Sequence, residues 1–276
     1  MNESAWNPLA PLRPLLRHHA LLRQFARRMI EQRHRGSFLG LAWTVLSPLC
    51  SLAIYTFVFG FVFRGRFTDS PTETNLDYAL GIFLGLVLFN FLGEVLSQSP
   101  GAIVTQPNLV KKVVFPLEIL PAAAVASALF TAGITLGLAL VGVAVLGDGL
   151  DAHAFLLLLI IPPVVLIGMG CAWFLAGLGV FIRDISAGMP FVIQILVYMS
   201  AVFYPLRLIE KAPPLLQKIV LANPLLHAVE STRRVVLWHQ TVEASTLGML
   251  WLTGIVLCLG GYAVFHKLRP AFADVV

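Results

Sequence analysis

Long apolar runs separated by short polar connections dominate the pattern of hydrophobic and polar positions along this chain. A helix needs about 20 apolar residues to cross the roughly 30 Å of hydrocarbon in a bilayer. Six runs reach or approach that length, so we expect each of them to form a membrane-spanning helix. They cover residues 38–63, 78–97, 119–147, 153–182, 185–206 and 244–266.

The region between the fifth and sixth runs does not fit this pattern. The stretch 215–222 is apolar but too short to span, and charged residues interrupt the stretch 225–238. Two short re-entrant helices at the outer interface fit these stretches, and a surface amphipathic hairpin is the alternative. The residues that break the pattern are Asn223, Pro224, Glu230, Arg233 and Arg234.

The segment before the first run has the periodicity of an amphipathic helix over residues 15–33. At 100° per residue, most of its apolar side chains share one face and most of its arginines share the opposite face. This pattern predicts a helix that lies in the cytoplasmic interface of the membrane. Its arginines either anchor the helix by the positive-inside rule or bind an anionic headgroup or the carboxylates of a partner.

The composition agrees with a membrane protein, because 58% of the 276 residues are hydrophobic and only 12% are charged. Soluble domains carry about 25% charged residues. We expect an all-α polytopic protein with six transmembrane helices, an N-terminal amphipathic interfacial helix and two short re-entrant helices. Its parts would be a cytoplasmic N-terminal segment at 1–37, one membrane domain at 38–266 and a cytoplasmic tail at 267–276.

The distribution of basic residues predicts the orientation in the membrane. Twelve of the 19 lysines and arginines lie in the N-terminal segment, the second-to-third and fourth-to-fifth connections and the tail. The other seven lie in the remaining connections, five of them between the fifth and sixth runs. By the positive-inside rule, both termini are therefore expected in the cytoplasm.

Sequence motifs for catalysis are missing from the chain. It contains no GxxxxGK[ST] phosphate loop, no HExxH metal motif and no GxSxG nucleophile motif. Cys50, Cys171 and Cys258 lie singly in apolar runs, which is typical of small buried hydrophobic residues. We expect no catalytic residue, metal site or cofactor on this chain, and the pattern indicates a conduit whose energy comes from elsewhere. An intramembrane transferase is the enzyme alternative, but it would need a polar catalytic group at depth.

The polar segment 98–112, between the second and third runs, is a candidate docking element. Ser99-Pro100 resembles a helix N-cap with a proline at the first helical position, and Gln106-Pro107 resembles a second one. One or two short cytoplasmic helices are therefore expected here. A basic connecting loop is the simpler interpretation, and the missing ATP site favours a contact with a soluble subunit.

Five stretches, in order along the chain, resemble the permease subunits of type-2 ABC exporters. The similarity is to the group that exports O-antigen, capsule and teichoic acid polysaccharides, and it extends over residues 31–238. The chain departs from the group at His34 and Gly36, where Tyr and Arg are more usual. The five stretches are 31–43 running on to Pro48, 107–121, Arg183-Asp184, Phe203-Tyr204-Pro205 and Asn223-Pro224-Leu225.

The resemblance implies a homodimer in the cytoplasmic (inner) membrane, bound to two copies of an ABC ATPase that hold the ATP and Mg²⁺. The first, second and fifth spans would line a channel between the protomers for a polysaccharide on polyprenyl pyrophosphate, with O-antigen the leading candidate. The N-terminal helix and the segment after the second span would form the cleft for the ATPase. The short helices before the sixth span would gate the external side. Membrane lipid is a further expected partner, and nucleic acid is not.

Four sets of candidate site residues follow from the resemblance and the residue pattern. We expect the basic cytoplasmic face to hold the pyrophosphate, with Glu94 pairing with one of the arginines. The aromatic side chains would stack on sugars, or else contact lipid in the ordinary way. The ATPase-docking set is Arg23, Arg27, Arg28, Ser99, Gln106, Asn108, Lys111, Lys112, Arg183 and Asp184. The cytoplasmic gate set is Arg33, Arg35 and Glu94; the channel aromatics are Trp43, Tyr55, Phe57, Tyr198, Phe203 and Tyr204; the external gate set is Asn223, Pro224, Arg233 and Arg234.

Two other transport functions are consistent with the same residues. The first is a permease for capsule or teichoic acid, and the second is a type-2 permease for a drug or small lipid. An open, aromatic pore in the dimer would favour a glycan, whereas a closed and dry interface would favour the small lipid.

Overall fold

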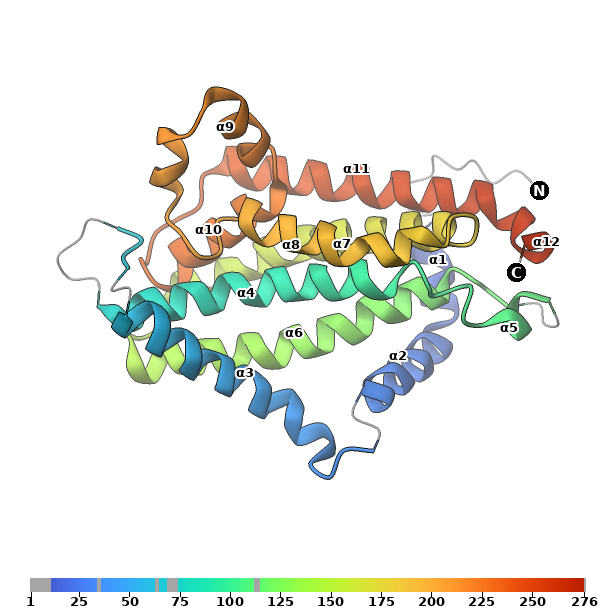
Figure 1. The fold of residues 1–276 in the computed structure, drawn as a ribbon, viewed down its shortest axis with the longest axis horizontal. Helices are drawn as coiled ribbons and strands as arrows, with labels where there is room; N and C mark the ends of the chain where they lie inside the picture. Colours follow the sequence, from blue (N-terminus) through green and yellow to red (C-terminus); the bar gives the residue numbers. More distant parts are fainter. Residues whose placement is uncertain (1–10, 34–35, 63–64, 69–73, 112–114, 276) are drawn as a thin grey trace.

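Helices form almost all of the structure (Figure 1). The computed structural model describes residues 11–33, 36–62, 65–68, 74–111 and 115–275, and within them there are helices and turns but no strand. Five helical segments of this part are long and apolar enough to cross a membrane, which confirms an all-α polytopic protein. They are Gly40–Val62, Asn75–Gln98, Ile119–Leu146, Ala152–Gly179 and Ala244–Val275.

The α-helices follow one another along the chain in an order close to that expected. They are α1 (Leu12–Arg17), α2 (His19–Arg33), α3 (Trp43–Tyr55), α4 (Asn75–Gln98), α5 (Pro107–Lys111), α6 (Ile119–Leu146), α7 (Leu157–Gly179), α8 (Asp184–Met199), α9 (Pro214–Leu221), α10 (Pro224–Val236), α11 (Ala244–Leu268) and α12 (Phe272–Val275). A 3₁₀ turn at Gly40–Ala42 precedes α3 and a π-helical turn at Thr56–Val62 follows it, so the first apolar run is helical from residue 40 to 62.

The central helix of the bundle is α4, which is buried along almost its whole length because its sequence is apolar around the full circumference. It contacts α6, α7, α8 and α10. Thr74 begins the helix with a capping box. The Thr74 hydroxyl accepts a hydrogen bond from the Asp77 N–H at 3.2 Å, and the Asp77 carboxylate accepts one from the Thr74 N–H at 2.9 Å. Helices α6, α7, α8 and α10 therefore lie around α4, whereas α11 packs mainly against α7.

The N-terminal amphipathic segment is divided in two, whereas the sequence predicts one helix over 15–33. The chain leaves helical geometry at His18, where φ is −113° and ψ is 31°, so that α2 begins at His19. Helix α2 packs against α6, and its arginines Arg23, Arg27 and Arg28 are exposed. The amphipathic arrangement is as expected, and the break lets α1 and α2 take different directions (Figure 1).

The fifth apolar run forms a shorter helix than its predicted range of 185–206. Helix α8 ends at Met199, because Ala201 takes the left-handed value φ +50° and the next turn is not helical. The carbonyl groups of Ala201 and Val202 accept hydrogen bonds from Arg233 of α10 instead of from helical N–H groups. At 16 residues and 1.5 Å per residue, α8 is about 24 Å long, which is shorter than the hydrocarbon layer.

Two short helices, α9 and α10, lie between the fifth and sixth apolar runs, at the positions where two short helices are expected. Pro213 precedes α9, and Asn223 caps α10 by accepting a hydrogen bond from the Leu225 N–H at 3.0 Å. Helix α9 stands at one end of the bundle, whereas α5 and α12 lie at the opposite end (Figure 1). The long helices therefore separate the end that carries α9 from the end that carries α5 and α12 (Figure 1).

Candidate functional site

A cavity of about 230 Å³ with both apolar and polar side chains on its walls lies between α3, α4 and α6. Hydroxyl groups recur on the cavity face of α3 at Thr44, Ser47 and Ser51, at helical spacing. Trp43 and Tyr55, two of the predicted channel aromatics, also line the cavity. The other polar lining residues are Arg33, Asn90, Glu94, Thr131 and Thr135.

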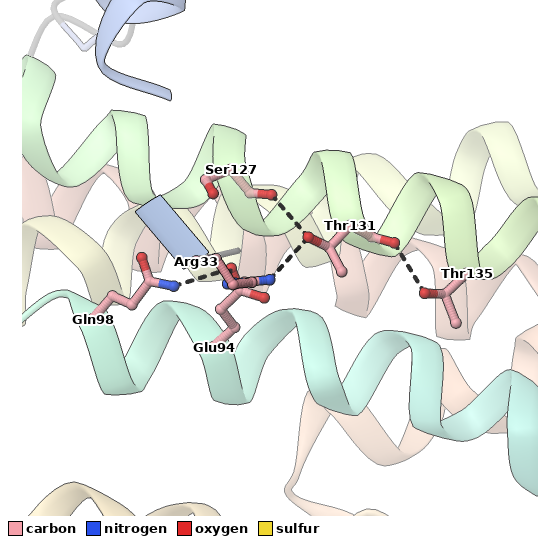
Figure 2. Close-up of polar contacts among 6 residues, drawn as sticks. All are labelled: Arg33, Glu94, Gln98, Ser127, Thr131 and Thr135. Atoms are coloured by element: carbon pink, nitrogen blue, oxygen red, sulfur yellow. Dashed lines mark hydrogen bonds and ion pairs between the residues drawn. The ribbon is translucent and has the colours of Figure 1, made fainter. Parts of the chain in front are cut away.

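An ion pair between Arg33 and Glu94 lies at one side of this cavity, where α2 ends beside α4 (Figure 2). One guanidinium nitrogen of Arg33 bonds Glu94 Oε1, and the other terminal nitrogen donates to Thr131 Oγ1 at 3.0 Å. Gln98 Nε2 donates to the same Glu94 oxygen at 3.0 Å. The expected pairing of Glu94 with an arginine is present, and charge-assisted bonds of this kind are the strong class. Arg35 lies outside the described residues.

A series of hydroxyl groups continues from this ion pair along α6. Thr135 Oγ1 donates to the Thr131 carbonyl at 3.0 Å, and Thr131 Oγ1 donates to the Ser127 carbonyl at 3.4 Å (Figure 2). Such bonds to the carbonyl four residues earlier satisfy a hydroxyl in apolar surroundings. The spacing Ser127, Thr131, Thr135 is visible in the sequence, but no charged residue marks it, so the sequence alone did not assign it to the site.

The six predicted channel aromatics fall into two groups in the structure. Phe57 and Tyr198 are 64% and 59% exposed, and Trp43 is 39% exposed. Tyr55 and Phe203 pack against each other within the chain, with ring centroids 6.1 Å apart, and Phe59 stacks on Phe203 at 5.5 Å. Tyr204 donates its hydroxyl hydrogen to the Tyr198 carbonyl. Phe57 and Tyr198 are therefore more than half exposed in this chain, whereas Trp43 is mostly covered.

The predicted docking residues gather at the end of the bundle that carries α2, α5 and the α7–α8 turn. Arg28 and Gln106 line a shared groove of about 250 Å³ with Gln98. Lys112 lies outside the described residues. The docking residues that are exposed are Arg23, Arg27, Arg28, Asn108, Lys111, Arg183 and Asp184.

The structure contradicts the prediction that a helix begins at Ser99-Pro100. Ser99 does not begin a helix but ends α4, where its hydroxyl donates to the Val95 carbonyl at 2.5 Å and its N–H bonds the same carbonyl at 3.1 Å. The side chain is fully buried. The predicted start of a helix at Ser99-Pro100 is therefore wrong, because the serine hydroxyl turns back into α4. The predicted start at Gln106-Pro107 is where α5 begins.

One of the predicted external gate residues, Arg233, lies inside the protein. Arg233 is fully buried, and it donates to the carbonyls of Gly81, Ala201 and Val202 at 2.9, 2.9 and 2.6 Å. Its guanidinium carbon lies 3.9 Å from the centre of the Phe67 ring, a cation–π contact. Arg233 therefore joins α10 to α4 and to the turn after α8.

Asn223 strengthens the same junction. Its side-chain nitrogen donates to the Met199 carbonyl at 3.1 Å and to Ser200 Oγ at 3.0 Å, while Pro224 begins α10 behind it. Arg234, the fourth member of the set, is half-buried. The pattern of charges could not show which of the two neighbouring arginines faces inward.

A polar junction at the α9 end of the bundle was missed by the sequence analysis. Asp151 Oδ2 lies 2.5 Å from His153 Nδ1, and Asp151 Oδ1 lies 3.2 Å from His239 Nδ1. The hydrogen bond from His153 holds the pKa of Asp151 below its ordinary value of 3.8. The two histidines are far apart in the sequence, and neither stands in a recognisable motif.

A comparison of the sequence with known protein families shows the family to which this chain belongs. Residues 20–237 match the ABC-2 type transporter family, and the chain therefore belongs to that family. Members are multi-pass transport permeases rather than enzymes, and they work with an ABC ATPase partner.

Three relatives with assigned names are similar to this chain over most of its length. The chain is 25% identical to the O-antigen export system permease protein RfbA of Myxococcus xanthus, over 95% of this chain and 98% of the relative. It is 24% identical to a protein of the same name from Klebsiella pneumoniae, over 90% and 91% of the two chains. It is also 24% identical to the polysialic acid transport protein KpsM of Escherichia coli, over 86% and 89%.

Proposed function

We propose that this chain is the channel-forming permease of an ATP-driven exporter in the cytoplasmic membrane. Its substrate is a polysaccharide attached to a polyprenyl pyrophosphate carrier, and the specific polysaccharide that we propose is O-antigen. The names of the relatives from Myxococcus xanthus and Klebsiella pneumoniae support the substrate class, and nearly the whole chain is aligned with them. The observation that carries the proposal is a cavity whose apolar walls carry hydroxyl groups from α3 and α6, with an arginine at its edge.

Arg33 is suited to the diphosphate of such a carrier. Its guanidinium is planar, always charged and able to donate two parallel hydrogen bonds to phosphate oxygens. In the structure these donors are held by Glu94 and Thr131. A diphosphate at the cavity would compete with Glu94 for Arg33, while Gln98 would retain the freed carboxylate through its own hydrogen bond. The Arg33–Glu94 ion pair would thus form when the site is empty and break when the anionic substrate binds Arg33.

The sixth crossing in this proposal is made by α8 together with the turn that follows it. The roughly 6 Å by which the helix falls short of 30 Å would be covered by residues 200–206. Non-helical backbone is tolerated at membrane depth where protein groups satisfy it, and Arg233 and Asn223 supply such donors. With this crossing both termini are cytoplasmic, and α9 and α10 re-enter the outer leaflet.

A homodimer would cover the apolar surfaces that a single chain leaves open beside the cavity. Helix α8 has no buried residue, and Phe191, Ile195 and Tyr198 on it are 71%, 59% and 59% exposed. On the first span, Phe57 and Phe61 are 64% and 73% exposed. Both elements would line the channel between two protomers, where their aromatic rings could stack on sugars.

Two copies of the ABC ATPase would bind at the end that carries α2 and α5 and would hold the ATP and Mg²⁺. The groove between Arg28, Gln98 and Gln106 lies there, and the exposed side chains around it are mostly basic. Carboxylates of the ATPase are the expected counterparts. The resemblance to KpsM makes export of a capsule polysaccharide the second candidate, with the same mechanism.

Transport into inverted membrane vesicles tests the proposal. Vesicles that contain the chain and its ABC ATPase should take up polyprenyl-pyrophosphate-linked polysaccharide when ATP is added. Arg33→Gln should lower uptake about tenfold, equivalent to the loss of one charge-assisted hydrogen bond. Arg17→Gln, at an exposed arginine of α1, is the matched control and should leave uptake unchanged. Equal uptake by both variants would refute the role of Arg33.

A further inference from the structure

The segment after the last span folds back onto the connection between α4 and α6. Arg269 Nη1 lies 3.1 Å from Glu118 Oε2, and Glu118 is only 8% exposed. Phe272 is fully buried, with its ring 5.4 Å from that of Phe265 and 6.1 Å from that of Phe181. The last turns of the chain are therefore packed into the same end of the bundle that carries the docking residues.

Glu118 stands where the connection from α5 enters α6, since α6 begins at the next residue. Its position is fixed twice. Its carboxylate pairs with Arg269, and its backbone carbonyl accepts a hydrogen bond from Trp173 Nε1 of α7 at 3.1 Å. Trp173 is itself fully buried and meets Tyr262 of α11 edge-on at 5.0 Å. One residue of the connection is thus tied to α7, and through Arg269 to the segment after α11.

The contact continues from Glu118 to α5. A groove of about 360 Å³ separates α5 from the C-terminal segment, with Leu109 and Val110 on one wall and Pro270 and Phe272 on the other. Helices α5 and α12 also contact each other directly. A displacement of α5 therefore meets the C-terminal segment directly, and the same segment holds Glu118, seven residues after the end of α5, through Arg269.

A buried carboxylate such as that of Glu118 is stable only while a partner compensates its charge. The pair with Arg269 meets this need, so the two residues are coupled in any state that keeps Glu118 buried. Arg269 is 36% exposed at its side chain, and His266 lies beside it on the wall of the groove. The exposed arginine can follow a movement of the connection while the carboxylate remains paired.

We propose that Arg269 is a positioning residue for the ATPase contact: through Glu118 it fixes the α5 connection relative to α7 and α11, so that force applied to α5 moves these helices. The inference rests on the proposed function, because it requires an ATPase that presses on α5. It assigns the C-terminal segment a part in energy coupling.

The ratio of polysaccharide transported to ATP hydrolysed tests this inference. Arg269→Gln should keep ATPase binding and hydrolysis but lower the ratio by about fivefold or more, the lower end of coupling between distant sites. The reversed pair Arg269→Glu with Glu118→Arg should recover much of the ratio. Lys267→Gln, two residues away and exposed, is the matched control and should not change it.

A second variant separates coupling from folding. Arg269→Gln with Glu118→Gln removes the pair without leaving a buried charge, so the protein should reach wild-type amounts in the membrane and still show the lowered ratio. A wild-type ratio in this double variant would overturn the inference. If the wild-type chain bound no ATPase at all, the proposed function would fail instead, and the two failures are therefore distinguishable.

Discussion

The backbone of Gly261 in α11 lies directly against the carbonyl oxygen of Gly170 in α7. A Cβ atom added at Gly261 would stand 2.0 Å from that oxygen, and one added at Gly170 would stand 2.2 Å from the Leu257 carbonyl. Gly254 makes a similar approach to the Pro163 carbonyl, at 2.8 Å. Small residues let membrane helices approach closely, and here they bring residues 163–170 of α7 against residues 254–261 of α11.

Gly261→Ala should destabilise the protein, because the new methyl group meets backbone and neither helix can move without disturbing the other contacts. The expected loss is about 1–3 kcal/mol in the free energy of unfolding, the range for overpacked cores. Thermal unfolding of the purified protein in detergent measures it. The control is Gly260→Ala, where nothing lies within 4 Å of the added atom. An equal unfolding temperature for the two variants would contradict the packing.

Arg233→Met should destabilise the junction between α4, α10 and the turn after α8. The variant leaves the carbonyls of Ala201 and Val202 buried without their donor, and each buried unsatisfied group costs about 1–3 kcal/mol. The adjacent Arg234→Met is the control, with an expected change within about 0.5 kcal/mol. The free energy of unfolding of each variant is measured in detergent. If Arg233→Met and Arg234→Met lowered it equally, the buried arginine would not stabilise the turn after α8.

Asp151→Asn should weaken the junction with His153 and His239 in a pH-dependent manner. Because the folded pKa of Asp151 lies below the ordinary value of 3.8, its carboxylate stabilises the fold above that value. This contribution is lost as the pH falls through the lowered pKa. The unfolding temperatures of wild type and variant should therefore differ when the pH is well above 3.8 and approach each other as the pH falls below 3.8. Asp148→Asn, an exposed neighbour, should show no such trend.

The number of membrane crossings can be read from the two ends of the chain. Six crossings place the termini on the same side, whereas the five long spans alone would place them on opposite sides. In a background without Cys50, Cys171 and Cys258, we expect a membrane-impermeant maleimide added outside to label Ser245→Cys but not Ala273→Cys. Labelling of Ala273→Cys from outside, while Gln24→Cys in α2 stays protected, would show that α8 does not cross.

The sequence predicted most of the helices, because long apolar runs and arginine periodicity are properties of single segments. It also placed Glu94 opposite an arginine, since both lie near one end of their helices and carry opposite charges. The end of α8 could not be predicted in the same way. Residues 200–206 continue the apolar run, and the groups that bond the backbone where α8 ends come from far along the chain: Asn223 bonds the Met199 carbonyl, and Arg233 bonds the carbonyls of Ala201 and Val202.

The role of Ser99 was likewise not decided by local pattern. A serine before proline is as suitable for starting a helix as for ending one, and only the bond back to the Val95 carbonyl distinguishes the two. The Arg269–Glu118 pair joins the last residues of the chain to the start of α6, and nothing in either segment alone indicates the other.

The central claim is that this chain supplies a route while a separate ATPase supplies the energy. The most direct test is transport of polyprenyl-pyrophosphate-linked polysaccharide in proteoliposomes that contain the chain with or without its ABC ATPase. We predict that transport occurs only when the ATPase and ATP are both present, and that it stops when an ATPase unable to hydrolyse ATP is used. Sustained transport by the chain alone, without ATP, would contradict the account.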